Sequence, residues 1–405
     1  METALEDPPF PMARDPRCPF DPAPELTEWQ RESRLKRVRL WSGQTAYVIL
    51  RHADQLAILS NPAVSANTGH PNFPHALPAT KVLKAAGRGV LVSLDNPDHD
   101  VVRRMLTRDF MVKAAERRRD ALGVLVDQLL DEMLAGPKPA DYVSQFALAL
   151  PSRVICDLLG VPDSDHEYFQ GRSDLLLSAR ATEQEARDAL ADLHAYLGAL
   201  ADRKVGQPTD DLISRLVEHM QRGELTRAEV VTTGVFLLIA GHETTANMIG
   251  LSTLALLRNP GQLAQVRDTE DPKVVANAVE ELLRYLHTPH SGLTRVALED
   301  IVVGDEVIPA GSGLILTGNV ADRDPAVFPD RPDEVDIRRS ARQHLAFGFG
   351  IHQCLGQSLA RVELQVVLSK VFKRIPTLAL AVPFDSLEFK IESFTYGARA
   401  IPVTW

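Results

Sequence analysis

The sequence predicts a mainly α-helical protein with small β-sheets, and three observations support this prediction. Hydrophobic residues follow helical spacing over most of residues 53–287. One helical pattern continues from residue 226 to residue 258, which is far longer than an average globular helix. Strand-like patterns are short and occur in a few segments, such as 37–50 and 301–316. We expect one domain over residues 1–405, in which 1–24 form a Pro-rich N-terminal lead.

The composition fits a globular protein that does not bind nucleic acid. The 405 residues are 45% hydrophobic, which allows a sizeable core, and the net charge is −10. A protein this negative is repelled by nucleic acid and by anionic membrane surfaces. Residues 1–24 lack the pattern of a signal peptide, and the chain has no long apolar span. We therefore expect a cytoplasmic monomer that is not anchored to a membrane.

The N-terminal part is predicted to form a hairpin and then a long loop. Apolar and polar residues alternate over 37–50, with Gly43 in the middle, which is typical of two paired strands. Prolines and glycines are frequent in 61–88, and these residues favour turns over regular structure.

Three predicted helices matter most for function. Thr226 and Glu229 form a capping-box pattern at the start of the helix over 226–258, and Asn-Pro ends it. A second helix is predicted over 272–286, and a third begins just after residue 354 and ends near 375. The first helix is apolar on most sides, so we expect it to cross the core.

Three cysteines, Cys18, Cys156 and Cys354, are too few and too widely spaced for a disulfide framework or a cysteine metal site. Such sparse use suits a reducing cytosol. Cys156 lies in an apolar run and is predicted to be a small buried hydrophobe. Cys18 lies in the Pro-rich lead, where no pattern gives it a role.

Cys354 lies in a distinctive segment, 347–356, with the sequence FGFGIHQCLG. The glycines permit tight turns and the close approach of a flat ligand. The helix predicted to follow supplies backbone N–H groups and a dipole that stabilise a thiolate. The alternative is a glycine-rich turn with a buried cysteine, which is a weak account of ten residues in a fixed arrangement.

A second segment, AGHETT at 240–245, lies in the middle of the long helix. Ala240 and Thr244 share a helix face, and Gly241 has no side chain to block a ligand. A hydroxyl next to a carboxylate can relay protons, so Thr244 and Glu243 are candidate catalytic groups. In the alternative, Thr244 only donates a hydrogen bond to the carbonyl four residues earlier, and both descriptions can hold together.

These two segments resemble motifs of the cytochrome P450 family. Segment 347–356 matches every fixed position of the family's haem-binding loop, Phe-Gly-x-Gly-x-(Arg/His)-x-Cys-x-Gly, and 240–245 matches (Ala/Gly)-Gly-x-(Asp/Glu)-Thr-(Thr/Ser). The resemblance extends from about Phe10 to Trp405 and is strongest for soluble actinobacterial members of the 105 family. It implies the P450 fold, with haem between the long helix and the helix after Cys354.

The resemblance also implies residue roles. Cys354 would be the axial ligand of haem b, Glu243 the acid and Thr244 the alcohol over the haem. Glu281 and Arg284, which alone indicate an ordinary exposed helix pair, would form a buried structural triad with Arg339. The other implied haem contacts are His99, Arg103, Ala240, Gly241, Arg295, His344, Phe347, Gly348, His352 and Gly356.

The substrate would lie on the side of the haem opposite Cys354. Its expected walls are mostly apolar or small, which is consistent with a lipophilic molecule. His290 is the exception, because it could hydrogen-bond a substrate or simply face solvent. The expected pocket residues are Leu237, Thr288, Pro289, His290, Leu293, Phe394 and Thr395.

We expect a monooxygenase of secondary metabolism that inserts one oxygen atom from O2 into a lipophilic small molecule, by hydroxylation or epoxidation. Electrons would come from NAD(P)H through a ferredoxin reductase and a ferredoxin, because the chain has no flavin, iron–sulfur or nicotinamide motif. Exposed arginines such as Arg104 and Arg342 would dock the ferredoxin. The alternatives are a haem-thiolate peroxygenase, a nitric oxide reductase and a non-enzymatic haem sensor, and the pair Glu243 and Thr244 argues against all three.

Overall fold

The computed structural model describes residues 7–15, 18–76, 90–177, 182–391, 393 and 395–405. The chain divides into two compact units, and each is described by itself. Unit 1 comprises residues 1–85, 92–97 and 280–354, and unit 2 comprises residues 86–91, 98–279 and 355–405.

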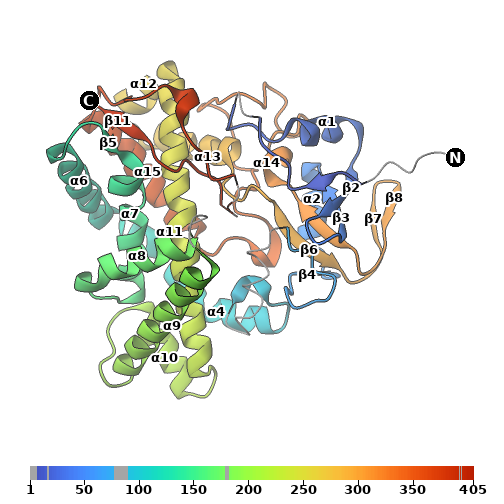
Figure 1. The fold of residues 1–405 in the computed structure, drawn as a ribbon, viewed down its shortest axis with the longest axis horizontal. Helices are drawn as coiled ribbons and strands as arrows, with labels where there is room; N and C mark the ends of the chain where they lie inside the picture. The colour runs from blue at the N-terminus through green and yellow to red at the C-terminus, as the bar shows by residue number, and fades with distance from the viewer. Residues whose placement is uncertain (1–6, 16–17, 77–89, 178–181, 392, 394) are drawn as a thin grey trace. The chain divides into compact units, whose positions relative to one another are not determined.

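Unit 1 is built on a six-stranded sheet with the order β1-β2-β3-β9-β6-β4. β2 and β3 are antiparallel, with Arg37 opposite Tyr47, and Gly43 makes the turn at φ +84°. The predicted hairpin is therefore confirmed. β3 pairs in parallel with β9, which brings residues far apart in the sequence side by side (Figure 1). The strands are β1 (Pro9–Phe10), β2 (Leu35–Leu40), β3 (Thr45–Ile49), β4 (Val64–Ser65), β6 (Leu293–Ala297) and β9 (Gly313–Leu316).

Among its described residues, unit 1 also contains a second, smaller sheet and the helices α1 (Pro24–Glu32), α2 (His52–Leu59) and α14 (Gly318–Ala321). β7 (Ile301–Val303) and β8 (Glu306–Ile308) form an antiparallel hairpin. The sequence patterns did not predict α1, which has Pro24 in its first turn. Of the loop predicted over 61–88, residues 61–76 are irregular apart from β4, and 77–88 lie outside the described residues.

Unit 2 is mainly helical. Its helices are α4 (Asp98–Phe110), α5 (Val112–Glu116), α6 (Arg119–Ala135), α7 (Ala149–Leu159), α8 (His166–Leu177), α9 (Glu183–Gly206), α10 (Leu212–Gln221), α11 (Arg227–Arg258), α12 (Pro260–Asp268) and α15 (Gln357–Arg374). α13 (Pro272–Leu286) begins in unit 2 and continues into unit 1. β10 (Ala379–Leu380), β11 (Pro402–Thr404) and β5 (Ala140–Asp141) form a three-stranded sheet.

The long helix α11 has the predicted start and the predicted environment. Thr226 Oγ1 accepts a hydrogen bond from Glu229 N, and Thr226 N donates to Glu229 Oε2, so the capping box is complete. α11 packs against α7, α9 and α10, and Figure 1 shows it running alongside α9 and α10. Residues on every side of α11 are buried, as expected for a helix that crosses a core. The predicted helices over 272–286 and after Cys354 are also present as α13 and α15.

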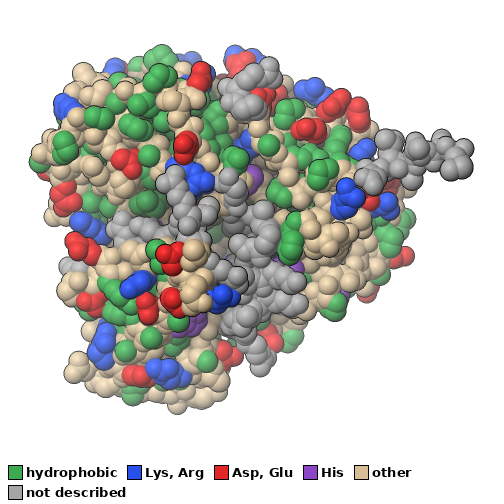
Figure 2. Space-filling view, in the orientation of Figure 1, with side chains coloured by type: hydrophobic (Ala, Val, Ile, Leu, Met, Phe, Trp, Pro, Cys, Tyr) green, Lys and Arg blue, Asp and Glu red, His purple; other side chains and the backbone are tan. Residues whose placement is uncertain are grey.

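The surface carries charged side chains of both signs, as in most globular proteins. Acidic and basic side chains are interspersed over the face shown in Figure 2. Among the described residues, no helix has both the length and the apolar character needed to span a membrane.

Candidate active site

The Cys354 segment of unit 1 folds into a tight loop. The backbone N–H of Cys354 donates to Phe347 O at 2.8 Å and closes the loop. Gly348 and Gly350 have φ angles of +67° and +72°, a region that L-amino acids other than glycine rarely adopt. The side chain of Cys354 is exposed, whereas Cys156 in unit 2 is buried as predicted, and burial raises the pKa of the Cys156 thiol to about 12.

Glycine is needed at position 350 for a second reason, because the backbone of the Cys354 loop packs directly on the backbone of Leu59. A Cβ at Gly350 would lie 2.3 Å from the carbonyl oxygen of Leu59, at the end of α2. At Gly348 the nearest atom would be Leu293 Cδ1 at 3.3 Å. The loop can therefore pack on the end of α2 only because position 350 has no side chain, whereas a side chain at 348 would require a small shift of Leu293.

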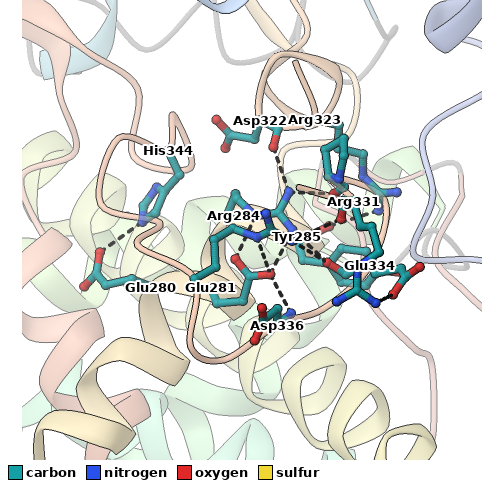
Figure 3. A network of polar contacts seen from close by, with 12 residues as sticks. Glu280, Glu281, Arg284, Tyr285, Asp322, Arg323, Arg331, Glu334, Asp336 and His344 are labelled. Atoms are coloured by element: carbon teal, nitrogen blue, oxygen red, sulfur yellow. Dashed lines mark hydrogen bonds and ion pairs between the residues drawn. The ribbon is translucent and has the colours of Figure 1, made fainter. Parts of the chain in front are cut away.

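The predicted triad is assembled in unit 1 (Figure 3). Arg284 Nε lies 2.7 Å from Glu281 Oε2, and Arg284 Nη2 lies 2.9 Å from Glu281 Oε1. Neither side chain is exposed. Arg339 Nε donates to Glu281 Oε1 at 3.2 Å, and so does the backbone N–H of Asp336 at 2.8 Å. The Glu281 carboxylate is therefore compensated by two guanidinium groups and one amide.

Arg284 also ties α13 to the chain that leads into the Cys354 loop. Its Nη1 donates to the carbonyls of Asp322 and Pro332, each at 2.8 Å, and its Nη2 donates to Glu334 O at 3.1 Å. One buried guanidinium thus fixes three points of irregular backbone. Such a contact needs the planar group of arginine with its several donors.

A buried carboxylate that the sequence analysis missed anchors the start of the loop. The backbone N–H of Leu345 donates to both oxygens of Asp322, at 2.7 and 3.0 Å. His287 Nε2 lies 2.6 Å from Asp322 Oδ2. Asp322 lies just after the short helix α14, in a segment to which the sequence analysis gave no role. Its full burial, which the sequence does not reveal, is what gives it this role.

His344 has protein partners at both ring nitrogens. Nδ1 accepts from the backbone N–H of Ala346 at 3.2 Å, so Nε2 carries the proton that is donated to Glu280 Oε2 at 3.1 Å (Figure 3). A haem contact through His344 stays a prediction. It would use ring carbon atoms or replace one of these two partners.

Arg295, on β6, carries a charge that the protein compensates only partly. Its Nη1 donates to the carbonyl of Thr294 at 2.7 Å. Burial lowers the pKa of the guanidinium to about 10, and the nearby charge of Asp95 offsets only part of this effect. A bound carboxylate would stabilise the charged form of this arginine.

The AGHETT segment lies on α11 of unit 2. Thr244 Oγ1 donates to Ala240 O at 2.8 Å, which is the local hydrogen bond that the sequence offered as an alternative. Glu243 is buried. Close packing of the helices favours glycine at position 241, because a Cβ there would lie 3.1 Å from Ile155 Cδ1 on α7. The missing side chain therefore also fits the close packing of α11 against α7, and a ligand contact at Gly241 stays a prediction.

Lys390 is a second residue that the sequence analysis missed. Its Nζ lies 3.0 Å from Glu243 Oε1 and 3.1 Å from Asn247 Oδ1. No sequence pattern could have paired Lys390 with Glu243, because they are 147 positions apart.

His99 and Arg103 lie one turn apart on α4, as predicted. His99 is fully buried, with Nδ1 3.2 Å from Asp100 Oδ1, and Arg103 is half-buried. Of the basic residues predicted to dock a ferredoxin, Arg104 in unit 2 and Arg342 in unit 1 are exposed.

The expected substrate-pocket residues are mostly shielded from solvent. Thr288, His290, Leu237 and Thr395 are buried, and Pro289 and Leu293 are half-buried. His290 is 8% exposed, so the alternative that it faces solvent is wrong. Phe394 lies outside the described residues.

The chemistry of these groups fits a haem. Unit 1 supplies an exposed thiol at Cys354 and, at Arg295, a guanidinium whose charge a propionate would stabilise. In unit 2, a Cβ at Gly356 would meet no atom of the described residues within 4 Å, so space remains beside this backbone. Phe347 and His352 are half-buried on the loop.

Comparisons with known proteins agree with this chemistry. A family model described as cytochrome P450 matches residues 167–376. The chain is 46% identical to cytochrome P450 GfsF of Streptomyces halstedii, over 100% of this chain and 98% of that protein. The crystal structure of GfsF superimposes with a TM-score of 0.94 and covers 98% of this chain and 100% of GfsF.

Two further solved structures are similar over their whole length. Cytochrome P450 MoxA from Nonomuraea recticatena, a member of the 105 family, has a TM-score of 0.91 and 40% identity, covering 99% of this chain and 98% of MoxA. The mycinamicin VIII C21 methyl hydroxylase from Micromonospora griseorubida, solved with mycinamicin VIII bound, has a TM-score of 0.88 and 38% identity, covering 98% of this chain and 100% of that enzyme. The predicted fold and the predicted likeness to the 105 family are confirmed.

Proposed function

The chain belongs to the cytochrome P450 family, and we propose that it uses haem b, ligated by Cys354, to insert one oxygen atom from O2 into a lipophilic small molecule. Membership of the family makes the chain a haem-dependent monooxygenase. We also propose that units 1 and 2 act as one catalytic domain, since its relatives match the chain from end to end.

One observation carries the assignment of the ligand. Cys354 is an exposed thiol at the end of a loop whose backbone requires glycine at 348 and 350. Of the other cysteines, Cys156 is fully buried, and burial also raises the pKa of Cys18 above that of a free thiol. Cys354 is therefore the thiol best suited to bind a metal as a thiolate.

The proposed haem-binding residues divide by chemistry. Arg295, Arg103, His99 and His352 would hold the propionates, because cationic and N–H donors bind carboxylates. When bound, a thiolate-ligated haem activates O2 and favours cleavage of its O–O bond. Glu281, Arg284 and Arg339 would act indirectly, by fixing the chain that carries Cys354. The remaining proposed contacts are Ala240, Gly241, His344, Phe347, Gly348 and Gly356.

Proton transfer would fall to Glu243 and Thr244. The Thr244 hydroxyl donates to Ala240 O, so its oxygen lone pairs remain able to accept a proton from a second group. To pass a proton on, the hydroxyl must release Ala240 O for the duration of the transfer. Glu243 would resupply it, because a carboxylate held near the hydroxyl can act as a general acid and base.

The proposed substrate is a lipophilic secondary metabolite. The largely apolar residues expected to line the pocket support this, with Leu237 and Leu293 among them. Similar enzymes are named for mycinamicin VIII and for vitamin D3. We propose that ferredoxin and its reductase supply the electrons, with exposed arginines such as Arg104 in the docking surface.

The spectrum of the reduced, CO-bound protein tests the proposed ligand. The native protein should show the red-shifted Soret band of thiolate-ligated iron, and Cys354→Ser should lose it. Cys156→Ser is the matched control, because it removes a buried thiol, and it should keep the band. A native spectrum without the band, or an unchanged band in Cys354→Ser, would refute the assignment.

A second experiment separates the proposed reaction from its alternatives. NADPH, ferredoxin and ferredoxin reductase should support oxidation of mycinamicin VIII or vitamin D3, whichever shifts the haem spectrum on binding. Peroxide alone should support little product. Efficient turnover with peroxide but not with the electron donors would favour a peroxygenase.

A further inference from the structure

A lysine from the C-terminal segment of unit 2 lies against the carboxylate proposed as the acid. Lys390 Nζ is 3.0 Å from Glu243 Oε1 and 3.1 Å from Asn247 Oδ1. Glu243 and Asn247 are one turn apart on α11, so the ammonium bridges them. The side chains are 17% exposed for Lys390 and 6% for Glu243, so water screens this pair only weakly.

The backbone of Lys390 is held in place. Its N–H donates to Gly397 O at 2.9 Å, and Arg399 N–H donates to Glu388 O at 2.8 Å. Phe389 and Ala398 form a β-bridge between these two bonds. Lys390 therefore reaches α11 from a short two-stranded ladder rather than from a free loop. Because the backbone is already ordered, the contact costs only the conformational entropy of the side chain.

The opposite strand of this ladder contacts the same turn of α11. A Cβ at Gly397 would lie 2.2 Å from Asn247 Oδ1. Glycine at 397 is therefore required for the Asn247 amide to take its position beside Lys390. Two separate features of the ladder therefore contact the turn of α11 that carries Glu243: the side chain of Lys390 and the close approach allowed by Gly397.

The charges around this turn of α11 favour contact between Lys390 and Glu243. Burial lowers the pKa of His242 to about 4, and the positive charge of Lys390 adds to the effect. His242 is therefore neutral at pH 7. The positive charge of Lys390 is then balanced locally by the neighbouring carboxylate of Glu243.

We propose that Lys390 is a positioning residue for Glu243: it holds Oε1, so that the carboxylate takes up and releases each proton through Oε2 in a single orientation. One proton enters Oε2 from water and the same oxygen passes one to Thr244 Oγ1, while Lys390 keeps its own protons throughout. This inference rests on the proposed role of Glu243 as the acid.

The first test measures the contact without any reaction. Thermal unfolding is compared for the native protein, Lys390→Met, Glu243→Gln and the double variant. Lys390→Met should lower Tm in the native background and lower it less when Glu243 is already Gln, because the charged partner is gone. Lys373→Met is the control, since Lys373 forms an exposed pair with Glu270, and its Tm shift should be equal in both backgrounds.

The second test separates positioning from simple structural support. Oxidation of NADPH through ferredoxin and its reductase is followed with vitamin D3 as the probe. Lys390→Met should lower kcat by about tenfold with little change in KM, because proton transfer rather than binding is affected. The variant should also show a larger solvent isotope effect and release more hydrogen peroxide per NADPH, a readout that does not require conversion of the probe. Lys390→Arg, which keeps the charge, should recover most of the loss.

The outcomes are distinguishable. Equal Tm losses for Lys390→Met in both backgrounds would refute the pairing with Glu243. A coupled Tm loss with unchanged kcat, isotope effect and peroxide release would show that Lys390 is only structural. Failure of the proposed function would show differently, as a native protein that lacks the thiolate Soret band or does not oxidise NADPH.

Discussion

Arg284 and Glu281 form a two-point ion pair in unit 1, with Nε 2.7 Å from Oε2 and Nη2 2.9 Å from Oε1, and neither side chain is exposed. Arg284 donates in addition to three backbone carbonyls that precede the Cys354 loop. The pair thus joins a regular helix to the irregular chain that precedes the Cys354 loop.

Arg284→Lys should destabilise the protein although it keeps the charge. A lysine cannot reproduce the planar, bidentate contact, so the Glu281 carboxylate and the three carbonyls would lose donors while buried. The expected loss in the free energy of unfolding is about 3–5 kcal/mol. Urea unfolding measures it. Arg331→Lys, in an exposed pair with Glu334, is the control and should change stability by less than about 0.5 kcal/mol.

Gly350→Ala should destabilise the Cys354 loop. The residue has φ +72°, and a Cβ would lie 2.3 Å from Leu59 O. The positive φ alone costs about 1–2 kcal/mol, and the clash adds to it. Gly43→Ala measures the cost of a positive φ alone, because Gly43 has φ +84° and its Cβ would meet no described atom within 4 Å, so the difference between the two variants gives the cost of the clash. Equal losses of stability in the two variants would show that the contact with Leu59 does not matter.

Arg295→Met should have opposite effects on the apoprotein and on haem binding. Burial lowers the pKa of Arg295 to about 10, so its charge is costly when no anion is bound. Removing the charge should raise the stability of the apoprotein by about 1 kcal/mol. It should weaken haem binding, because the proposed propionate partner is lost. Apoprotein unfolding and haem titration measure the two effects, and unchanged haem affinity would exclude Arg295 as a contact.

Protonation of His242 should lower the free energy of unfolding in acid. Its pKa falls from 6.5 to about 4, mainly through burial. Between these values the unfolded chain binds the proton more readily than the folded protein, so stability falls as the pH falls. Its contribution from pH 7 to pH 5 should be a loss of about 2 kcal/mol. His242→Gln should remove that part of the pH dependence, whereas His70→Gln, at a partly exposed site, should not. A variant with the native pH dependence would contradict the prediction.

Much of the site could be predicted because its signals are local. Cys354 and its glycines, and Glu243 beside Thr244, are close in sequence, and each short segment carries its own geometry. Asp322 and Lys390 could not be predicted in this way. Asp322 looks like one more polar residue of a loop, and Lys390 resembles any other lysine until packing removes water from around it.

The sequence by itself determined where the main helices begin and end, which cysteine lies in a glycine-rich loop, and which helix carries the proposed acid and alcohol. These features depend on contacts within a few residues, such as the capping box at Thr226 and the positive φ at Gly350. Only the tertiary structure decided which groups compensate the buried charges: Arg284 and Arg339 for Glu281, and Lys390 for Glu243. The physical reason is that the cost of a buried charge is set by burial and by neighbours distant in sequence, which appear only when the chain has packed.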